Sequence, residues 1–313
     1  MSNKKVQVAN CNVVFLEKKE EAPLLKYFDS IILPALQSGI KKENGDTAYL
    51  FTDIEVSEDE EKGYILAGNI VKKTIIEIKS DLNDNEELIE KDEKYSSAPF
   101  SAFAIYLRNH RMIFVQNQKG SPTIKNFSAT IKYVLATYIK KYNAEQDNKE
   151  KYLPFPVINI VGIPLRSNIK EALKEVKKIN KIILRFYPLN GDQEFGDMFG
   201  TMITDIRRMT DVNKGDIVLK SPKSVNGVVE LIEKSGGTVA PILEVTYPDK
   251  TKGKITNDML TERMEMGFSG DNIQEMNEVI EQGKKIKSLN FVSKNNEKIY
   301  EENKSKIIPF IRK

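Results

Sequence analysis

Histidine and cysteine are nearly absent from this sequence, and tryptophan is missing altogether. The single cysteine, Cys11, excludes an intramolecular disulfide and predicts a reducing compartment. It lies in an apolar run, where we expect a buried thiol. One cysteine and one histidine also exclude zinc sites built from clusters of these residues. The histidine, His110, could serve a serine-type triad, but it stands between Arg108 and Arg111, where we expect an exposed turn.

Long apolar runs and nucleotide-binding loops are missing as well. No stretch approaches the roughly 18–20 apolar residues that cross a membrane, and no apolar segment follows the first residues as in a signal peptide. We therefore expect a cytoplasmic protein without membrane insertion. The phosphate-loop pattern GxxxxGK[ST], a strand-linked GxGxxG and the GxSxG of hydrolases do not occur. These absences predict a protein without a cofactor.

Apolar periodicity predicts an α+β fold with two lobes of mixed sheets and packed helices. Strands are expected at residues 6–16, 47–56, 63–78, 103–107, 112–116, 156–164, 181–187, 216–220 and 239–247. Helices are expected at residues 22–38, 123–144, 169–179, 195–209, 225–234 and 272–283. The charged segment 80–94 is expected to be a mobile loop, and residues 288–311 to hold short strands. A polar break at residues 143–152 predicts two domains, 1–146 and 147–313.

Charge is distributed unevenly along the chain, although the net charge is only +3. Residues 1–97 carry 13 lysines and arginines against 20 carboxylates, residues 98–189 carry 16 against 5, and residues 190–313 carry 19 against 20. A surface that gathers the basic residues of the middle third would attract phosphates with little sequence preference. The alternative is a set of ordinary solvated faces, neutralised in space by the acidic N-terminal third.

Eight basic side chains are the candidates for phosphate contact in double-stranded DNA. On the helix expected from Thr123, Lys125, Lys132 and Lys140 recur every two turns and share one stripe. The turn Gly120-Ser121-Pro122 before this helix could offer backbone N–H groups to a phosphate. The eight candidates are Arg108, Arg111, Lys119, Lys125, Lys170, Lys174, Lys177 and Lys178.

A carboxylate metal site is the alternative that would make the protein an enzyme. Glu77 and Lys79 share one face of an expected strand, and Asp53 lies on the preceding strand. Restriction-type nucleases use such an Asp…Glu-x-Lys set to hold Mg²⁺ and to activate water. A second acidic cluster, Asp192, Glu194 and Asp197, could bind a cation but is more typical of a helix start.

The middle of the chain resembles a known family in the order of its segments. The residues that suggest this are 99–103, 111–114, the turn 120–122 and, further on, 169–178 and 182–188. Over about residues 98–200 they resemble the RexA-like superinfection-exclusion proteins of phages and, more broadly, abortive-infection proteins. The resemblance implies a cytoplasmic, dimeric protein that binds double-stranded DNA without strong sequence preference and acts in phage defence. The first 97 residues and the turn 108–111 lie outside it.

Three functions therefore remain open at this point. The first is non-specific DNA binding in phage defence, with the acidic segments 58–61 and 81–93 competing for the DNA surface as an autoinhibitory polyanion mimic. The second is a Mg²⁺-dependent nuclease that uses Asp53, Glu77 and Lys79. The third is a protein-interaction subunit that binds a second defence protein.

Overall fold

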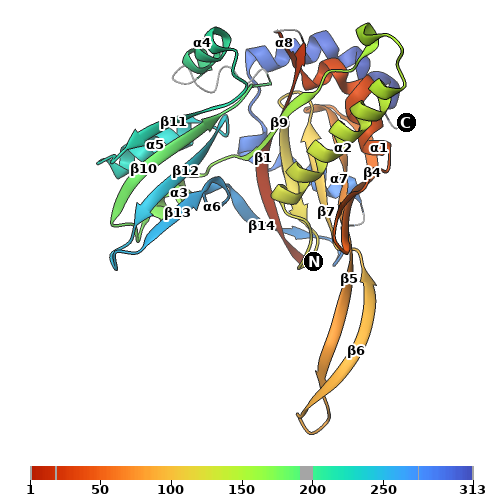
Figure 1. The fold of residues 1–313 in the computed structure, drawn as a ribbon, viewed down its shortest axis with the longest axis vertical. Helices are drawn as coiled ribbons and strands as arrows, with labels where there is room; N and C mark the ends of the chain where they lie inside the picture. The colour runs from red at the N-terminus through yellow and green to blue at the C-terminus, as the bar shows by residue number, and fades with distance from the viewer. Residues whose placement is uncertain (1, 18–19, 191–199, 274, 312–313) are drawn as a thin grey trace.

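The protein is an α+β fold built on two sheets, as the sequence predicts (Figure 1). The computed structural model describes residues 2–17, 20–190, 200–273 and 275–311. The larger sheet has ten strands, the smaller has four, and neighbouring named strands pair antiparallel. The expected mixed sheets are therefore antiparallel sheets in the described part of the chain.

Strand β1 (Ser2–Glu17) organises the larger sheet. Its first half lies between β14 (Arg263–Phe268) and β8 (Arg111–Gln116), and its second half pairs with β9 (Pro156–Gly162) and β2 (Glu20–Pro23). Beyond β8 the order continues with β7, β5, β4 and β3. These strands span Phe100–Tyr106, Gly63–Leu82, Thr47–Asp59 and Lys42–Asn44.

Helices cover both faces of this sheet because its strands alternate between two apolar sets. On β1, Ala9, Cys11 and Val13 face the core under helix α2 (Ile124–Ala144), whereas Val6 and Val8 face the core under α7 (Met276–Lys284). Cys11 is fully buried, as predicted, and burial raises the pKa of its thiol to about 12. An inert structural thiol follows from this environment.

Aromatic rings fix α2 on its face of the sheet. Phe127 is fully buried, and its ring centroid lies 4.9 Å from that of Phe103 and 6.0 Å from that of Phe114. The segment expected as one helix over residues 22–38 packs beside α2 as three short pieces. They are a 3-10 turn (Leu24–Tyr27), a π turn (Phe28–Ile32) and α1 (Leu33–Gln37). Pro34 stands at the start of α1, where its missing N–H costs nothing.

The smaller sheet has the order β11-β10-β12-β13. Its strands span Gly215–Lys220, Lys178–Phe186, Val239–Thr246 and Lys252–Thr256. Helices α3 (Arg166–Leu173) and α5 (Val225–Lys234) share its apolar core. Helix α4 (Gly200–Thr210) is the described part of the helix expected at residues 195–209, and the rest of that prediction lies outside the described residues.

The two sheets do not follow the division expected between residues 146 and 147. β9 comes after that point and yet pairs with β1, and the chain returns from the small sheet to the large one through β14 and α7. The expected short strands of residues 288–311 are instead helical: α8 (Lys294–Asn303) and 3-10 turns pack against the large sheet. Which segments belong to which sheet is therefore decided by strand pairing between segments that are distant in the sequence.

The segment expected as a mobile loop at residues 80–94 is a β-hairpin. β5 continues beyond the sheet and pairs with β6 (Leu88–Ser97), from Thr74 opposite Ser97 to Leu82 opposite Leu88. The two strands project from the body as a long arm (Figure 1). Cross-strand contacts such as the 2.8 Å ion pair between Glu77 and Lys94 favour pairing over a solvated loop. We call residues 74–97 the arm.

The expected hairpin of β7 and β8 is confirmed, but its histidine is buried. His110 is 1% exposed, its φ is +57°, and neither ring nitrogen has a hydrogen-bond partner. The turn is covered because the Asn109 side chain donates to the carbonyl groups of Leu289 and Phe291, at 2.8 and 2.9 Å. The expectation of an exposed turn is wrong because a segment far along the chain closes over it.

Replacing His110 with asparagine should weaken the acid sensitivity of folding. Burial lowers the pKa of His110 to about 4, below its ordinary value of 6.5. Between these values the unfolded chain binds a proton that the folded protein does not. Wild-type stability should therefore fall as the pH drops through this window, by up to about 3 kcal/mol.

Urea unfolding of the two proteins across that pH window measures the difference. Asparagine tolerates a positive φ, so the His110→Asn variant should fold. Carboxylates titrate alike in both proteins and cancel in the comparison. Parallel loss of stability in wild type and variant would contradict the assignment.

Candidate nucleic-acid interface

The N-terminus of α2 opens onto the part of the sheet that this helix does not cover. Thr123 caps the helix: its hydroxyl accepts from the Asn126 N–H, and the Asn126 side chain accepts from the Thr123 N–H. The next N–H groups, of Ile124 and Lys125, have no acceptor within the helix, and the helix dipole adds positive potential there. This end of α2 therefore favours an anion.

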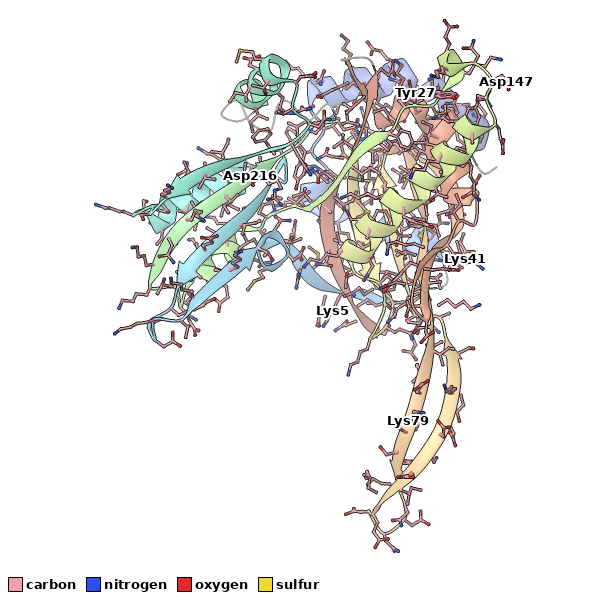
Figure 2. All side chains as sticks on the ribbon, viewed as in Figure 1. Lys5, Tyr27, Lys41, Lys79, Asp147 and Asp216 are labelled. Atoms are coloured by element: carbon pink, nitrogen blue, oxygen red, sulfur yellow. The ribbon has the colours of Figure 1, made fainter. Side chains whose placement is uncertain are left out.

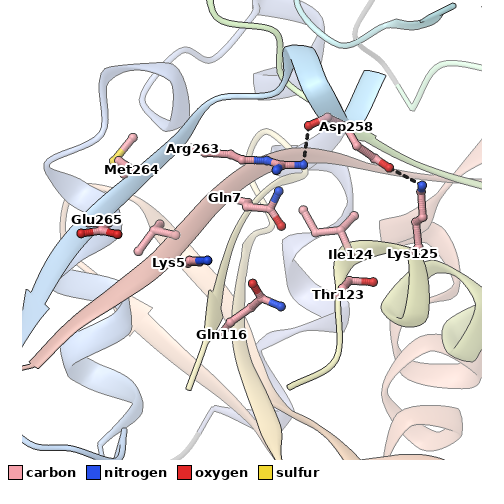
Figure 3. Close-up of a pocket in the computed structure, with 11 residues that line it drawn as sticks. Lys5, Gln7, Gln116, Thr123, Ile124, Lys125, Asp258, Arg263, Met264 and Glu265 are labelled. Carbon is pink, nitrogen blue, oxygen red and sulfur yellow. Dashed lines mark hydrogen bonds and ion pairs between the residues drawn. The ribbon is translucent and has the colours of Figure 1, made fainter. Parts of the chain in front are cut away.

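The strands beneath this end change from apolar to polar where α2 stops. The β1 row that places Ala9 and Cys11 under the helix continues to Gln7 and Lys5. The β8 row ends at Gln116, which is opposite Lys5. Arg263 of β14 is opposite Gln7. Lys5, Gln7, Gln116 and Arg263 line a hollow of about 500 Å³ (Figure 3).

The charges in this hollow are mixed, with cations at its rim. The Lys125 ammonium lies 2.6 Å from the Asp258 carboxylate, and Arg263 donates to the Asp258 carbonyl oxygen. Glu265 is the second carboxylate. Lys125 is nonetheless 75% exposed, so its pair with Asp258 is a weak surface interaction that a phosphate could replace.

A second hollow of about 490 Å³ adjoins the first and shares Lys5 and Gln116 with it. Lys119 and Gly120 line its far side, and Gly120 has a φ of +85° that allows the tight turn before α2. Its wall includes the nearly buried Lys4, whose ammonium donates to the carbonyl groups of Asn117 and Asp271. We call the two adjoining hollows the α2 groove.

A line of lysines leads away from the groove along α2. Lys125, Lys132 and Lys140 are exposed and fall within an arc of about 80° on the helix. The helix has 21 residues, among them four lysines and no carboxylate. The pKa of Lys132 is lowered by partial burial and by the neighbouring charge of Lys214. Positive charge therefore accumulates on this face.

Two predicted phosphate contacts, Arg108 and Arg111, lie elsewhere and hold the C-terminal segment. The Arg108 guanidinium binds both carboxylate oxygens of Glu297, at 2.5 and 2.7 Å, which raises its pKa and lowers that of Glu297. Arg111 is 3% exposed, donates to the Ser288 carbonyl and lies 5.6 Å from the Phe291 ring centroid. Neither arginine lines the α2 groove, because the turn that carries them is at the other end of β7 and β8.

The second predicted group lies across a short helix from the groove. Lys170 and Lys174 are exposed on and just after α3, and Lys177 and Lys178 are exposed where β10 begins. Helix α6 (Asn257–Leu260) contacts α3 and contributes Asp258 to the groove. These four lysines are therefore a neighbouring surface rather than part of the groove.

The structure brings two of the predicted nuclease residues together, with the Lys79 ammonium 3.7 Å from the Glu77 carboxylate, but leaves Asp53 apart from them. Asp53 sits at a bulge with φ +53° and accepts from Asn69, which is paired with Thr52. Glu77 is eight residues further along β5, roughly 25 Å at the rise of an extended strand. In the arm, Glu77 pairs with Lys94, and Lys79 with Asp92.

No cluster of three or more metal-ligating side chains occurs among the residues that the structure describes. The cluster of Asp192, Glu194 and Asp197 lies outside the described residues. The acidic turn 58–61 is at the end of the sheet that holds Arg108, whose side chain contacts the Glu61 carbonyl. That turn is therefore beside Arg108, one of the predicted DNA contacts, and distant from the α2 groove.

Lys5 and Arg263 are groove residues that sequence reasoning did not single out. The alternation of β1 contains a signal for Lys5, because Lys5 and Gln7 are on the same face of the strand as the buried Ala9 and Cys11. Arg263 has no local signal, because its place depends on a pairing between segments that are more than 250 residues apart in the chain.

Comparison of the chain with protein-family models and with curated proteins finds no match. The resemblance to RexA-like proteins therefore stays a prediction. Among the residues that the structure describes, none of the helices combines the length and apolarity that crossing a bilayer requires.

Arg111→Leu should destabilise the fold, because it removes a nearly buried guanidinium and leaves the partly buried Ser288 carbonyl without this donor. The expected loss is about 1–3 kcal/mol in urea unfolding. Arg166→Leu is the matched control: Arg166 is exposed and pairs with Glu233 at the surface, so its loss should cost less than about 1 kcal/mol. Equal stability of Arg111→Leu and wild type would contradict the anchoring role.

Glu77→Ala should leave any plasmid nicking unchanged in the presence of Mg²⁺. Its carboxylate is engaged by Lys94 and lies far along β5 from Asp53. Agarose gels of supercoiled plasmid, incubated with wild type or variant, measure this. If the wild type nicks plasmid and the Glu77→Ala variant does not, the nuclease hypothesis would be supported.

Proposed function

We propose that this protein binds double-stranded DNA without sequence preference, through phosphate contacts along α2 and in the α2 groove. The observation that carries the proposal is a 21-residue helix with four lysines and no carboxylate, whose N-terminus opens onto a groove rimmed by further cations. The contacts would come from Lys5, Lys119, Lys125, Lys132, Lys140 and Arg263.

The shape of this surface suits a long polyanion better than a small phosphate compound. Twenty-one residues of helix span about 30 Å, which matches roughly nine base pairs of a duplex. The lysines run along the helix rather than converging on one point. Neutralising several phosphates in a row releases counterions, and that gain is independent of base sequence.

The biological setting of the proposal comes from the resemblance to RexA-like proteins. It supports a cytoplasmic role in phage defence, with DNA occupancy as the event that is sensed. The lysines at residues 170–178 would then extend the same contact beyond α6 on a longer duplex. Arg108 and Arg111 have no part in it, because both hold the C-terminal segment.

Binding to a labelled non-specific duplex across a salt series tests the proposal. The logarithm of affinity should fall linearly with the logarithm of salt concentration. The Lys119→Ala/Lys125→Ala variant should reduce this slope by about 2, since each lost phosphate contact lowers it by about 0.9. Fluorescence anisotropy measures both.

The matched control is Lys298→Ala/Lys304→Ala, which removes two solvent-accessible lysines on and just after α8, a helix at the end of the molecule opposite the arm (Figure 1). Its slope should equal that of the wild type. Equal slopes for the groove variant and this control would show that DNA binds elsewhere. Absence of binding at low salt, with and without the arm, would reject DNA binding as the function.

A further inference from the structure

The arm, residues 74–97, carries exposed apolar side chains that the described part of the chain leaves uncovered. Among the described elements, β5 is the one against which β6 packs extensively. An isolated two-stranded hairpin is at best marginally stable in water. Leu88 is nevertheless 77% exposed and Leu82 59%. A covering surface from outside this copy of the chain would account for both observations.

The two faces of the arm differ in chemistry. One face carries ion pairs: Glu77 lies 2.8 Å from Lys94, and Lys79 lies 2.5 Å from Asp92. The other face is more apolar, because cross-strand partners share a face. Its apolar side chains are Ile76, Ile78, Leu82, Leu88 and Tyr95, and they share it with Glu93, opposite Ile78, and Glu90, opposite Ser80.

Charge identifies the kind of surface that the arm fits. The arm has eight carboxylates and three lysines, a net charge of −5, so the rest of the chain carries +8 within the total of +3. Four of these carboxylates, Asp84, Glu86, Glu87 and Glu90, lie at or next to the tip. The α2 groove has Ile124 and Met264 in its wall and a net positive lining, because its lysines and Arg263 outnumber the two carboxylates Asp258 and Glu265.

The arm of one copy cannot enter its own groove in this conformation. It continues β5 away from the body, as Figure 2 shows from the position of Lys79 relative to Lys5. The root of the arm and the groove are at the same end of the sheet, since the Asn117 N–H donates to the Phe100 carbonyl. A two-fold axis across that end could therefore bring each arm to the groove of the other copy.

We propose that two copies of this chain exchange arms, each inserting its acidic, apolar tip into the α2 groove of the other. The dimer is isologous and closed, because every copy gives one arm and receives one. The arm and DNA then compete for the same lysines, so the dimer is the form with its groove occupied. The competition between arm and DNA rests on the proposed function, whereas the arm exchange does not.

Removing the arm tests the dimer directly. Thr74 and Ser97 are cross-strand partners, so an Asn-Gly turn in place of residues 75–96 closes the strands without altering the sheet. Sedimentation equilibrium at low salt should give a dimer for the full chain and half that mass for the shortened one. A monomeric full chain, or a shortened chain that remains a dimer, overturns the proposal.

Reversing charges at the arm tip and in the groove tests whether these two surfaces contact each other, without removing the arm. Asp84→Lys/Glu90→Lys should convert the full chain to a monomer, and adding Lys119→Glu/Lys125→Glu should restore the dimer by reversing the groove as well. Glu58→Lys/Glu60→Lys is the control, because these exposed carboxylates lie at the opposite end of the sheet, and it should stay dimeric. If the Asp84→Lys/Glu90→Lys variant remains a dimer, the groove is not where the arm binds. The same conclusion follows if the added Lys119→Glu/Lys125→Glu substitutions do not restore the dimer.

Duplex binding by the shortened chain separates this inference from the proposed function. If the arm occupies the groove, the shortened chain should bind DNA at least tenfold more tightly than the full chain at a concentration where the full chain is dimeric. A shortened chain that is monomeric but does not bind DNA keeps the arm exchange and rejects the DNA function. Equal DNA affinity of the two chains rejects competition at the groove.

Discussion

Strand β1 pairs with β14, β8, β9 and β2, and the rest of the structure depends on these pairings. Its alternation assigns one set of side chains to the core under α2 and the other to the core under α7. A shift of one residue would exchange these sets, so the register is fixed by burial on both faces. The groove follows from this register, since Lys5 and Gln7 continue the row that α2 covers at Ala9.

Basic residues on this protein serve two different purposes, and burial separates them. Arg111 is nearly buried and binds a backbone carbonyl, and Arg108 is held by both oxygens of one carboxylate. Their charge is used inside the molecule. Lys132 and Lys140 are exposed on α2, which has no carboxylate, and Lys119 is exposed in the turn before it, so their charge remains available to a polyanion.

The arm and the groove are opposite in charge and lie at one end of the molecule. That arrangement links self-association to anion binding through shared lysines rather than through a conformational change. Both interactions weaken with salt, but the dimer also buries apolar side chains such as Leu82 and Leu88, which salt does not screen. Ionic strength and protein concentration would then set which of the two occupies the groove.

The amino-acid sequence by itself determined the α+β class, the β7–β8 hairpin, the long helix α2 and the lysine stripe on it, because these depend on local periodicity and turn chemistry. Only the tertiary structure decided that His110 is buried, that Arg108 and Arg111 are anchors, and that residues 80–94 belong to the arm. Each depends on a partner far along the chain or on cross-strand pairing. The groove itself required Lys5, Lys125 and Arg263 to meet, and pairing between β1 and β14 brings the two ends of the sequence together at that point.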